Sequence, residues 1–400
     1  MFSTILYILF WGLFTYCGLS ALYVFILSLS GKLFYRAKYS GYSTEKCTQR
    51  IAILVPAYKE DTIIYPTADN LLNLDYPSEL YDIYIIADSF QNETIEKLKQ
   101  LRLNVMEVSF EKSTKAKSLN EAFKRISEFY NVALICDADN MLSKDFLKNL
   151  NNAFENGAKA IQGRRVAKNL DTQFAILDAC SEGINNNVFR KGPSAMGLSS
   201  SVIGSGMAFD FRLIKEILSE IDVVGGFDKV LQLKVVEKGI NINYLEDLLI
   251  FDEKVSSSHA FGQQRKRWLS SQFIYLKQFF PKAIRQLFKG NVSYFNLAVL
   301  NNLILPRAFL IVLLPLFVLI AFFAYPASVV FALSFWMAYI IGLFIALPVD
   351  LMNRDLLRAL YRLPKAIGVM VATLFRLKNA NETFIHTVHT KTEINNSLLK

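Results

Sequence analysis

Two aspartates, Asp137 and Asp139, stand two residues apart directly after the apolar run at residues 132–136. Carboxylates at this spacing can both approach one hard cation, and Mg²⁺ or Mn²⁺ takes oxygen ligands that phosphate groups commonly complete. Such a cation would neutralise a leaving diphosphate. An isolated pair of this kind is also typical of a helix N-cap beside a solvated acid, but the position after a predicted buried strand favours a metal and diphosphate site.

A third acid, Asp88, directly follows another apolar run at residues 82–87. A carboxylate in this place can accept a hydrogen bond from a nucleobase or a ribose. An aspartate there is equally typical of a turn, so Asp88 alone leaves both interpretations open.

Two lysines, Lys115 and Lys117, stand at the start of a predicted helix. A lysine in this position can meet phosphate as a point charge, beside a helix N-terminus that also favours anions. The alternative is a solvated basic helix end. We assign Lys117 to the phosphate.

The elements that would position these side chains alternate along the chain. Short β-branched runs predict strands, and the amphipathic stretches between them predict helices. This alternation is typical of an α/β domain with a mostly parallel sheet and helices on both faces, in which ligands bind beyond the carboxyl ends of the strands. The predicted strands are 51–55, 82–87, 104–108, 132–136 and 158–162, with a late strand at 239–244, and the predicted helices are 62–74, 94–101, 116–130 and 144–156.

Apolar segments on both sides of this region are long enough to cross a bilayer. The first is 5–30, and basic residues come after it rather than before it, which favours a retained anchor over a cleaved signal peptide. Two further spans are predicted at 308–325 and 328–348, whereas 363–374 is short and is interpreted as re-entrant or interfacial. Positive charge next to such segments favours the cytoplasmic side, and it is carried by Lys32, Arg36, Lys38, Arg354, Arg358, Arg362 and Lys365.

The composition supports a protein that lies partly in lipid and partly in water. The 400 residues are 52% hydrophobic, with a formal net charge of +9 and a mean hydropathy of +0.28. The positive charge alone would also suit nucleic acid, but no nucleic-acid-binding signature accompanies it, so we expect no such partner. The four cysteines contain no CxxC pair, and His259, His386 and His389 are too dispersed to predict a metal cluster.

Taken together, these segments resemble the family 2 glycosyltransferases. Residues 56–60, Pro-Ala-Tyr-Lys-Glu, are similar to the family's first-strand Pro-x-Tyr/Asn-x-Glu, and residues 86–94 are similar to its second-strand acid and loop. Residues 115–120 resemble its Lys-Gly-x-Ala-Leu-Asn segment, with Ala116 in place of glycine. The Asp-Ala-Asp stretch matches the family's DxD. The resemblance implies a GT-A-like, Rossmann-like fold and a nucleotide-sugar donor bound by Pro56, Tyr58, Glu60, Asp88, Lys117 and Asp137.

The resemblance continues towards the acceptor side and the membrane. Residues 204–209 resemble the family's glycine-containing acceptor segment, which implies Gly204 and Ser205 as acceptor-binding residues. Residues 264–268 fit the Gln-x-x-Arg-Trp motif of membrane-bound synthases of cellulose, hyaluronan, chitin and poly-N-acetylglucosamine. In this motif Arg267 can bind diphosphate oxygens bidentately, Trp268 can stack on a sugar of the acceptor, and Gln264 would orient them. An interfacial helix with a tryptophan anchor is the alternative.

Two acids compete for the role of the family's catalytic base, the aspartate of a Thr-Glu-Asp motif. Asp247, in Leu-Glu-Asp, looks closer by eye, but it follows the predicted late strand and its spacing is poor. Asp228 opens an amphipathic helix, and its distance from Gln264 resembles the family spacing. We assign Asp228 as the base, although Phe227 replaces the usual glutamate, and an N-cap would suit this aspartate equally well.

The resemblance implies an inverting glycosyltransferase that needs Mg²⁺ or Mn²⁺. The leading hypothesis is transfer from a nucleotide sugar, with UDP-sugar expected, to a growing glycan, which could be processive polysaccharide synthesis. A single addition to a lipid-linked acceptor is the alternative, because three predicted spans offer few helices to line a channel. A homo-oligomer or an export partner could complete one. A non-catalytic membrane scaffold is a third hypothesis, supported by Ala116 and Phe227.

These assignments divide the chain into five parts in a multi-pass protein of the cell (inner or plasma) membrane. Residues 1–35 form a transmembrane anchor, and residues 45–268 form a cytoplasmic GT-A-like domain. Residues 269–306 form amphipathic interfacial helices, residues 307–375 form transmembrane or re-entrant helices, and residues 376–400 form a cytoplasmic tail.

Overall fold

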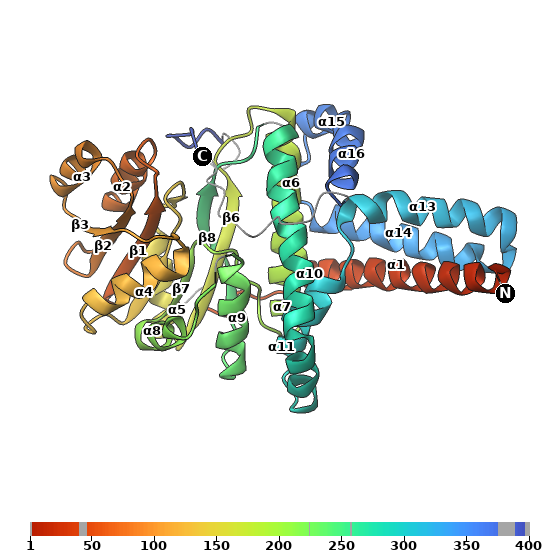
Figure 1. Cartoon of the computed structure of the whole chain (residues 1–400), viewed down its shortest axis with the longest axis horizontal. Helices are drawn as coiled ribbons and strands as arrows, with labels where there is room; N and C mark the ends of the chain where they lie inside the picture. Colours follow the sequence, from red (N-terminus) through yellow and green to blue (C-terminus); the bar gives the residue numbers. More distant parts are fainter. Residues whose placement is uncertain (1, 40–45, 224, 257, 375–388, 397–400) are drawn as a thin grey trace.

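The computed structural model describes residues 2–39, 46–223, 225–256, 258–374 and 389–396. Figure 1 shows a sheet with flanking helices at one end of the molecule, a bundle of long helices at the other, and helices α6 and α10 upright between them. One polypeptide therefore joins a sheet with flanking helices to a bundle of long helices.

The sheet contains eight strands in the described residues, in the order β3-β2-β1-β4-β7-β6-β8-β5. The first four are parallel, whereas β7 runs antiparallel to both of its neighbours and β5 is antiparallel to β8. The predicted α/β class is thus confirmed, and the sheet is mixed rather than parallel throughout. The strands are β1 (Ile51–Tyr58), β2 (Tyr81–Asp88), β3 (Asn104–Val108), β4 (Val132–Ile135), β5 (Met141–Leu142), β6 (Ala160–Ala167), β7 (Met207–Asp210) and β8 (Asn243–Asp252).

Two strands differ from the sequence prediction in a way that matters for the site. The strand predicted at 158–162 is β6, which runs on to Ala167 because its second half pairs with β8 across a register shift after Gly163. The strand predicted at 239–244 is β8, which starts at Asn243 and continues through Asp247 to Asp252. Both strands therefore extend to the edge of the sheet where β1 and β2 end.

Helices cover both faces of the sheet, as the alternation of elements predicts. Alternate residues of β1 belong to different cores: Ala52 and Leu54 pack with one group of helices, and Ile51, Ile53 and Val55 with the other. Such all-apolar strands are typical of a sheet that is buried on both faces. The first group contains α4 (Lys115–Arg125), α8 (Phe211–Ser219) and α9 (Phe227–Glu237), and the second contains α2 (Ile64–Leu72), α3 (Asn92–Lys99) and α5 (Phe146–Glu155).

A layer of further helices joins the sheet to the apolar bundle (Figure 1). Its longest member is α10, which begins at Ser258 and runs without a break past Trp268 to Phe288. The other elements are α6 (Gln173–Asn186), η1 (Asn187–Lys191), α7 (Gly192–Ala195), α11 (Val292–Phe295), η2 (Asn296–Leu300) and α12 (Asn301–Leu303).

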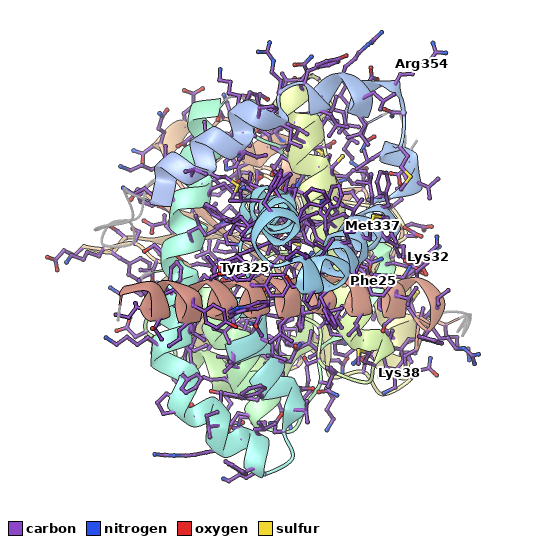
Figure 2. The ribbon with its side chains drawn as sticks, turned by 90° about the vertical axis from the view of Figure 1, so that its right-hand side faces the viewer. Phe25, Lys32, Lys38, Tyr325, Met337 and Arg354 are labelled. Atoms are coloured by element: carbon purple, nitrogen blue, oxygen red, sulfur yellow. The ribbon has the colours of Figure 1, made fainter. Side chains whose placement is uncertain are left out.

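Three helices in the described residues are long and apolar enough to cross a membrane: α1 (Phe2–Leu33), α13 (Arg307–Ala324) and α14 (Val329–Ala346). They pack closely, and a Cβ on Gly342 would lie 2.9 Å from the backbone of Phe25. Figure 2 views this end of the molecule and shows the basic side chains of Lys32, Lys38 and Arg354 around its margin. The remaining elements are η3 (Pro326–Ser328), η4 (Val349–Leu351), α15 (Arg354–Leu360) and α16 (Leu363–Leu374), and the short apolar α16 packs against α10.

A buried ionic cluster fixes α6 against the sheet. Glu182 of α6 accepts hydrogen bonds from Arg165 of β6 at 2.8 Å and from Arg190 of η1 at 3.0 Å. Burial opposes the charge on Glu182, yet the two guanidinium groups hold the pKa of this carboxyl well below its usual range. The cluster therefore stays ionised, and its charges depend on one another.

We predict that Glu182→Gln destabilises the protein by about 3–5 kcal/mol, because it leaves the buried Arg190 guanidinium without a counter-charge and removes one of the two carboxylates beside Arg165. Thermal unfolding in detergent would measure the loss. Glu246→Gln is the control, because Glu246 pairs with Lys191 at 2.6 Å with 34% of its side chain exposed, and its loss should be clearly smaller. Equal losses for the two variants would contradict the prediction.

Candidate active site

The carboxyl ends of β1 and β2 are held in a strained conformation. Lys59 and Ser89 are the non-glycine residues with positive φ, at 55° and 59°, among the described residues. They are neighbours across the two strands, and Lys59 N donates to Asp88 O at 3.1 Å. Strain of this kind is characteristic of functional sites, so the edge predicted to bind ligand is also where the backbone departs from its preferred conformations.

Asp88 lies at this edge with an unused hydrogen-bonding atom. Its side chain is buried, and Ser89 Oγ donates to Oδ1 at 2.9 Å. Within the part of the chain that the structure describes, Oδ2 has no hydrogen-bond partner. Because leaving a buried carboxylate oxygen unpaired is costly, this atom is suited to accept a hydrogen bond from a ligand.

The other first-strand residues assigned to the donor lie next to Asp88. Strand β4 pairs with residues 51–54 of β1, so Pro56 lies beyond that ladder. The missing backbone N–H of Pro56 therefore costs no hydrogen bond between β1 and β4. Tyr58 ends β1, and the Lys59 ammonium lies 5.1 Å from its ring centre. The carbonyl of Glu60 accepts from Ile63 N and Ile64 N and so leads into α2.

The Asp137 side chain meets a lysine, and that lysine is Lys115. Lys115 Nζ contacts Asp137 Oδ1 and donates to Gly204 O at 2.7 Å. Lys117 Nζ instead donates to Lys112 O at 3.2 Å on the exposed side of α4. The two lysines are two positions apart on a helix, about 200° around its axis, so only one can face the strand ends.

Asp139 is buried among other charges. Burial raises the pKa of its carboxyl to about 6, the carboxylates of Asp252 and Asp137 act in the same direction, and His389 and Lys168 oppose them. Lys168 is also buried, and its ammonium contacts the carbonyl of Asp139. Burial lowers the pKa of Lys168.

The segment 389–396 contacts this cluster, although it is more than 200 residues away from Asp139 in sequence. His389 Nδ1 is 3.4 Å from Asp139 Oδ2 and 3.8 Å from Glu253 Oε2. Glu253 accepts from Thr390 N and Lys391 N, both at 2.9 Å. Two asparagines fix its far end: Asn395 forms a parallel bridge with Asn169, and Asn396 Nδ2 donates to Ala167 O at 2.8 Å.

The side chains around Asp139 suit a hard divalent cation. Asp137, Asp139, Asp252 and Glu253 offer carboxylate oxygens, which Mg²⁺ and Mn²⁺ prefer. Within the described ranges, no group of three or more acidic, histidine or cysteine side chains is arranged to hold a metal ion.

A buried loop connects Asp137 to the helix that carries Asp228. Asp137 N donates to Ser205 Oγ at 2.9 Å, and Val202 N donates to Gln232 Oε1 of α9 at 3.1 Å. Gln232 and Asp228 are four residues apart and therefore lie on the same face of α9. Asp228, half-buried in the first turn of that helix, is thus on the side that faces the loop.

Gly226 sets the start of this helix. It has a left-handed φ of 65°, and a Cβ on it would lie 2.2 Å from the Tyr275 ring of α10. The Tyr275 hydroxyl donates to Gly225 O. Burial raises the pKa of Tyr275 to about 12, and the Asp228 carboxylate adds to this. The competing acid Asp247 is exposed within β8.

The Gln-x-x-Arg-Trp residues lie on α10. Gln264 Oε1 is buried and has no hydrogen-bond partner among the described residues. Trp268 is 38% exposed, and the Arg265 guanidinium stacks on its ring at 4.5 Å from the centre. The side chain of Arg267 lies outside the part of the structure that is described.

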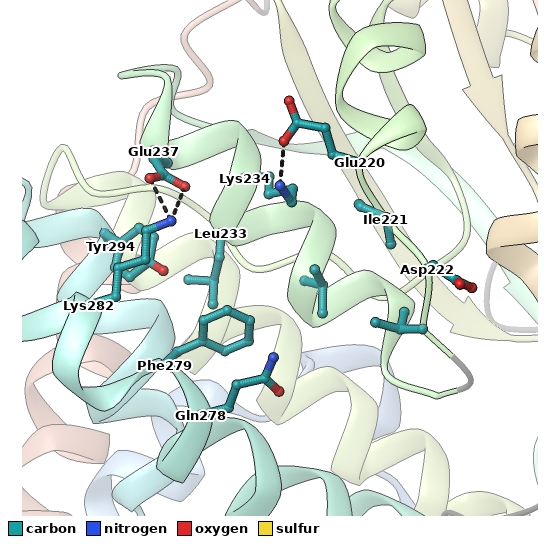
Figure 3. Close-up of a pocket in the computed structure, with 12 residues that line it drawn as sticks. Glu220, Ile221, Asp222, Leu233, Lys234, Glu237, Gln278, Phe279, Lys282 and Tyr294 are labelled. Carbon is teal, nitrogen blue, oxygen red and sulfur yellow. Dashed lines mark hydrogen bonds and ion pairs between the residues drawn. The ribbon is translucent and has the colours of Figure 1, made fainter.

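A separate cavity of about 260 Å³ lies between α9 and α10 (Figure 3). Leu233 and Phe279 form part of its lining, and Lys282 pairs with Glu237 at its rim. None of the strand-end residues lines it. It is therefore distinct from the site described above.

Together these side chains define a strand-end site in an α/β domain with a bundle of apolar helices. Residues 49–271, more than half of the chain, match the family described as Glycosyltransferase like family 2, and the chain belongs to this family. The more specific resemblance to cellulose and hyaluronan synthases stays a prediction.

Two similar proteins of known name match this chain over part of their length. It is 25% identical over 210 residues, 48% of the chain, to the dolichyl N-acetyl-alpha-D-glucosaminyl phosphate 3-beta-D-2,3-diacetamido-2,3-dideoxy-beta-D-glucuronosyltransferase of Methanococcus voltae. It is 24% identical over 266 residues, 64% of the chain, to the beta-monoglucosyldiacylglycerol synthase of Trichormus variabilis. The match spans 63% of the first relative and 54% of the second.

A solved mannosyltransferase from Pyrobaculum calidifontis, in complex with GDP-Man and Mn²⁺, is also similar. The TM-score is 0.45 and the identity 16%, over 82% of this chain and 99% of that chain.

Sequence reasoning missed several residues at this site: Lys115 as the partner of Asp137, and Lys168, Glu253 and His389 around Asp139. The segment at residues 115–120 that resembles the family's Lys-Gly-x-Ala-Leu-Asn begins with Lys115, and this match could have identified Lys115 as the lysine at the site. The other three come from β6, the end of β8 and the carboxy-terminal segment, and no local pattern joins them.

We predict that Lys115→Gln lowers the rate of sugar transfer by about 100-fold, because Asp137 and the Gly204 loop lose their common partner. Lys117→Gln is the matched control on the same helix, and its rate should stay within about twofold of wild type because its side chain is solvated. Steady-state assays of both variants measure this. A reversed order of the two effects would contradict the placement of the lysines.

We also predict that Glu253→Ala releases the segment 389–396, because the amides of Thr390 and Lys391 lose their acceptor. Cleavage by trypsin after Lys391 should become faster under native conditions, as mass spectrometry of the fragments would show. Glu393→Ala removes an exposed carboxylate of the same segment and should leave the cleavage rate unchanged. Equal rates for wild type and Glu253→Ala would show that other contacts hold the segment.

Proposed function

We propose that this protein is an inverting glycosyltransferase that uses a nucleotide sugar, with a UDP-sugar expected, at a membrane. The observation that carries the proposal is the unpaired, buried Oδ2 of Asp88 at the same sheet edge as the Asp137–Lys115 pair. The Asp88 oxygen can accept a hydrogen bond from the nucleoside of the donor. The Asp137–Lys115 pair supplies charged groups for the phosphates of the donor. Membership of the glycosyltransferase family supports this interpretation.

In the proposed reaction the donor lies across the ends of β1, β2 and β4. Asp88 accepts from the base or ribose beside Pro56, Tyr58 and Glu60, and Asp137 and Asp139 are the residues that would hold Mg²⁺ or Mn²⁺. When bound, the cation offsets the negative charge of the diphosphate. Gln264 and Arg267 complete the diphosphate site, as their motif implies.

The transfer itself requires a base on the acceptor side. Asp228 removes the proton of an acceptor hydroxyl while the hydroxyl oxygen bonds to the anomeric carbon of the sugar. The bond from that carbon to the diphosphate breaks, and the diphosphate leaves with the electron pair, so the configuration inverts. Gly204, Ser205 and Trp268 are the proposed contacts for the acceptor.

Single addition to a lipid-linked acceptor is the second candidate, next to processive glycan synthesis. The described residues contain three helices suited to crossing a membrane, which are few to line a polymer channel. We place the protein in the cell membrane with its sheet domain in the cytoplasm, because basic residues flank these helices. Product sizing distinguishes the two, since a ladder of long polymers would exclude single addition.

We predict that Asp228→Asn lowers the transfer rate by at least about 100-fold, the usual contribution of a general base, without weakening donor binding. Release of the nucleotide in the presence of acceptor measures the rate, and calorimetric titration with the donor measures binding. Chelation of divalent ions with EDTA should abolish release in the wild type.

Asp222→Asn is the matched control, because Asp222 is exposed a few residues before the same helix. Near-normal turnover of Asp228→Asn would remove this residue from the reaction. A wild-type protein that releases no nucleotide from any nucleotide sugar would favour the scaffold hypothesis instead.

A further inference from the structure

One side of α10 carries large apolar side chains that are open to solvent. Phe273, Ile274 and Phe280 are 51%, 47% and 45% exposed, and Phe288 at the end of the helix is 87% exposed. The three phenylalanines are about two turns apart, so they lie on the same side of the helix. Exposed apolar patches of this kind mark surfaces that meet another protein or a membrane.

The same helix is strongly basic. Its 31 residues contain six Lys and Arg and no Asp or Glu. Lys277 and Arg285 are exposed next to the apolar residues, as is Lys289 directly after the helix, and their side chains have no hydrogen-bond or ion-pair partner among the described residues. Lys282, by contrast, pairs with Glu237 at 2.6 Å. Cations among phenylalanines suit a partner that is both anionic and apolar. The exposed face of α10 is defined here by residues 273, 274, 277, 280, 285 and 288.

The opposite side of α10 packs onto the sheet domain. Tyr275 and Ala283 are buried in the core that contains α4, α8 and α9. Lys277 and Phe288 lie about 120–160° around the helix axis from both, at about 100° per residue, so the exposed face points away from the sheet. Helix α10 is upright in both views and lies across the direction in which α13 and α14 extend (Figures 1 and 2). A membrane crossed by α13 and α14 would therefore meet this face.

The charge of the face argues against a second copy of the chain as its cover. In a two-fold contact the same patch lies on both subunits, so Lys277 and Arg285 would face the same cations. Anionic headgroups supply the opposite charge, and the acyl chains below them can take up the phenylalanines.

We propose that the exposed face of α10 lies on a bilayer surface and binds anionic lipid headgroups through Lys277, Arg285 and Lys289. This inference rests on the membrane location in the proposed function and adds the class of lipid. The hydroxyl of Tyr275, on the packed side of the same helix, donates to Gly225 O just before α9. The lipid surface thus holds the helix that supports the start of α9.

Lipid retention by the full-length protein tests the role of the charges. Native mass spectrometry after incubation with mixed phosphatidylglycerol and phosphatidylcholine counts the lipids of each kind that stay bound. We expect the wild type to prefer phosphatidylglycerol by at least about tenfold. The combined variant Lys277→Gln, Arg285→Gln and Lys289→Gln should lose most of this preference, because each cation near an anionic surface contributes about fivefold.

A second combined variant, Lys97→Gln, Lys99→Gln and Lys124→Gln, is the matched control. It removes the same charge from the sheet domain, where each of these lysines pairs with a glutamate, and it should keep the preference. An unchanged preference in the α10 variant would overturn the proposal, and so would an equal loss in both variants.

Fluorescence quenching tests where the face lies. Phe280→Trp places a reporter on it, and Phe129→Trp places a matched reporter on the sheet domain, where Phe129 is 48% exposed. In nanodiscs with brominated acyl chains, the emission added by Phe280→Trp should fall by at least about half, because an interfacial helix buries its apolar face at the acyl boundary. The emission added by Phe129→Trp should not change. Equal emission of Phe280→Trp with and without bromine would overturn the proposal, and two copies per nanodisc together with that result would identify a second chain as the cover.

Both measurements require no sugar donor, so they fail or succeed apart from the proposed activity. A wild type that shows both lipid effects but releases no nucleotide from any nucleotide sugar would refute the transferase activity and keep the lipid surface. A wild type that releases nucleotide but shows neither lipid effect would keep the activity and refute the lipid surface.

Discussion

The side-chain amide of Gln162 holds the loop on which both halves of the candidate site depend. Its Nε2 donates to Ser205 O at 3.0 Å, and its Oε1 accepts from Ile203 N at 3.1 Å. Gln162 is fully buried, so leaving either end of the amide unpaired would cost about 1–3 kcal/mol. Gly206 allows the close approach, because a Cβ there would lie 2.2 Å from Ile250. One buried amide therefore selects one path for this loop.

From that loop the site extends in two directions. On one side Ser205 accepts from Asp137 N, and Lys115 joins the Asp137 carboxylate to the Gly204 carbonyl. On the other side Gln232 ties α9, and with it Asp228, to the same segment. The separation between the proposed diphosphate site and the proposed base is thus set by side chains that bind the backbone of this one loop.

The sequence predicts the parts of this arrangement that depend on local periodicity. The strands at 51–55, 82–87 and 132–136 exist, and their carboxyl ends meet, because parallel pairing brings them to one edge. It does not predict which of two lysines faces that edge, since this depends on the angular position of α4. Nor does it predict His389 beside Asp139, because that contact joins segments with no shared pattern and is decided by tertiary packing.

Helix α10 explains why elements so distant in sequence can serve one site. Along one continuous helix, Arg265 pairs with α6, Gln272 holds the entry to α13, and Tyr275 supports the glycines before α9. Because protein interiors are dense and resist local deformation, such contacts fix the relative positions of packed helices. Through Gln272 and Tyr275, α10 thus connects the start of α13 to the residues just before the first turn of α9, and so sets the position of Asp228 relative to the apolar helices.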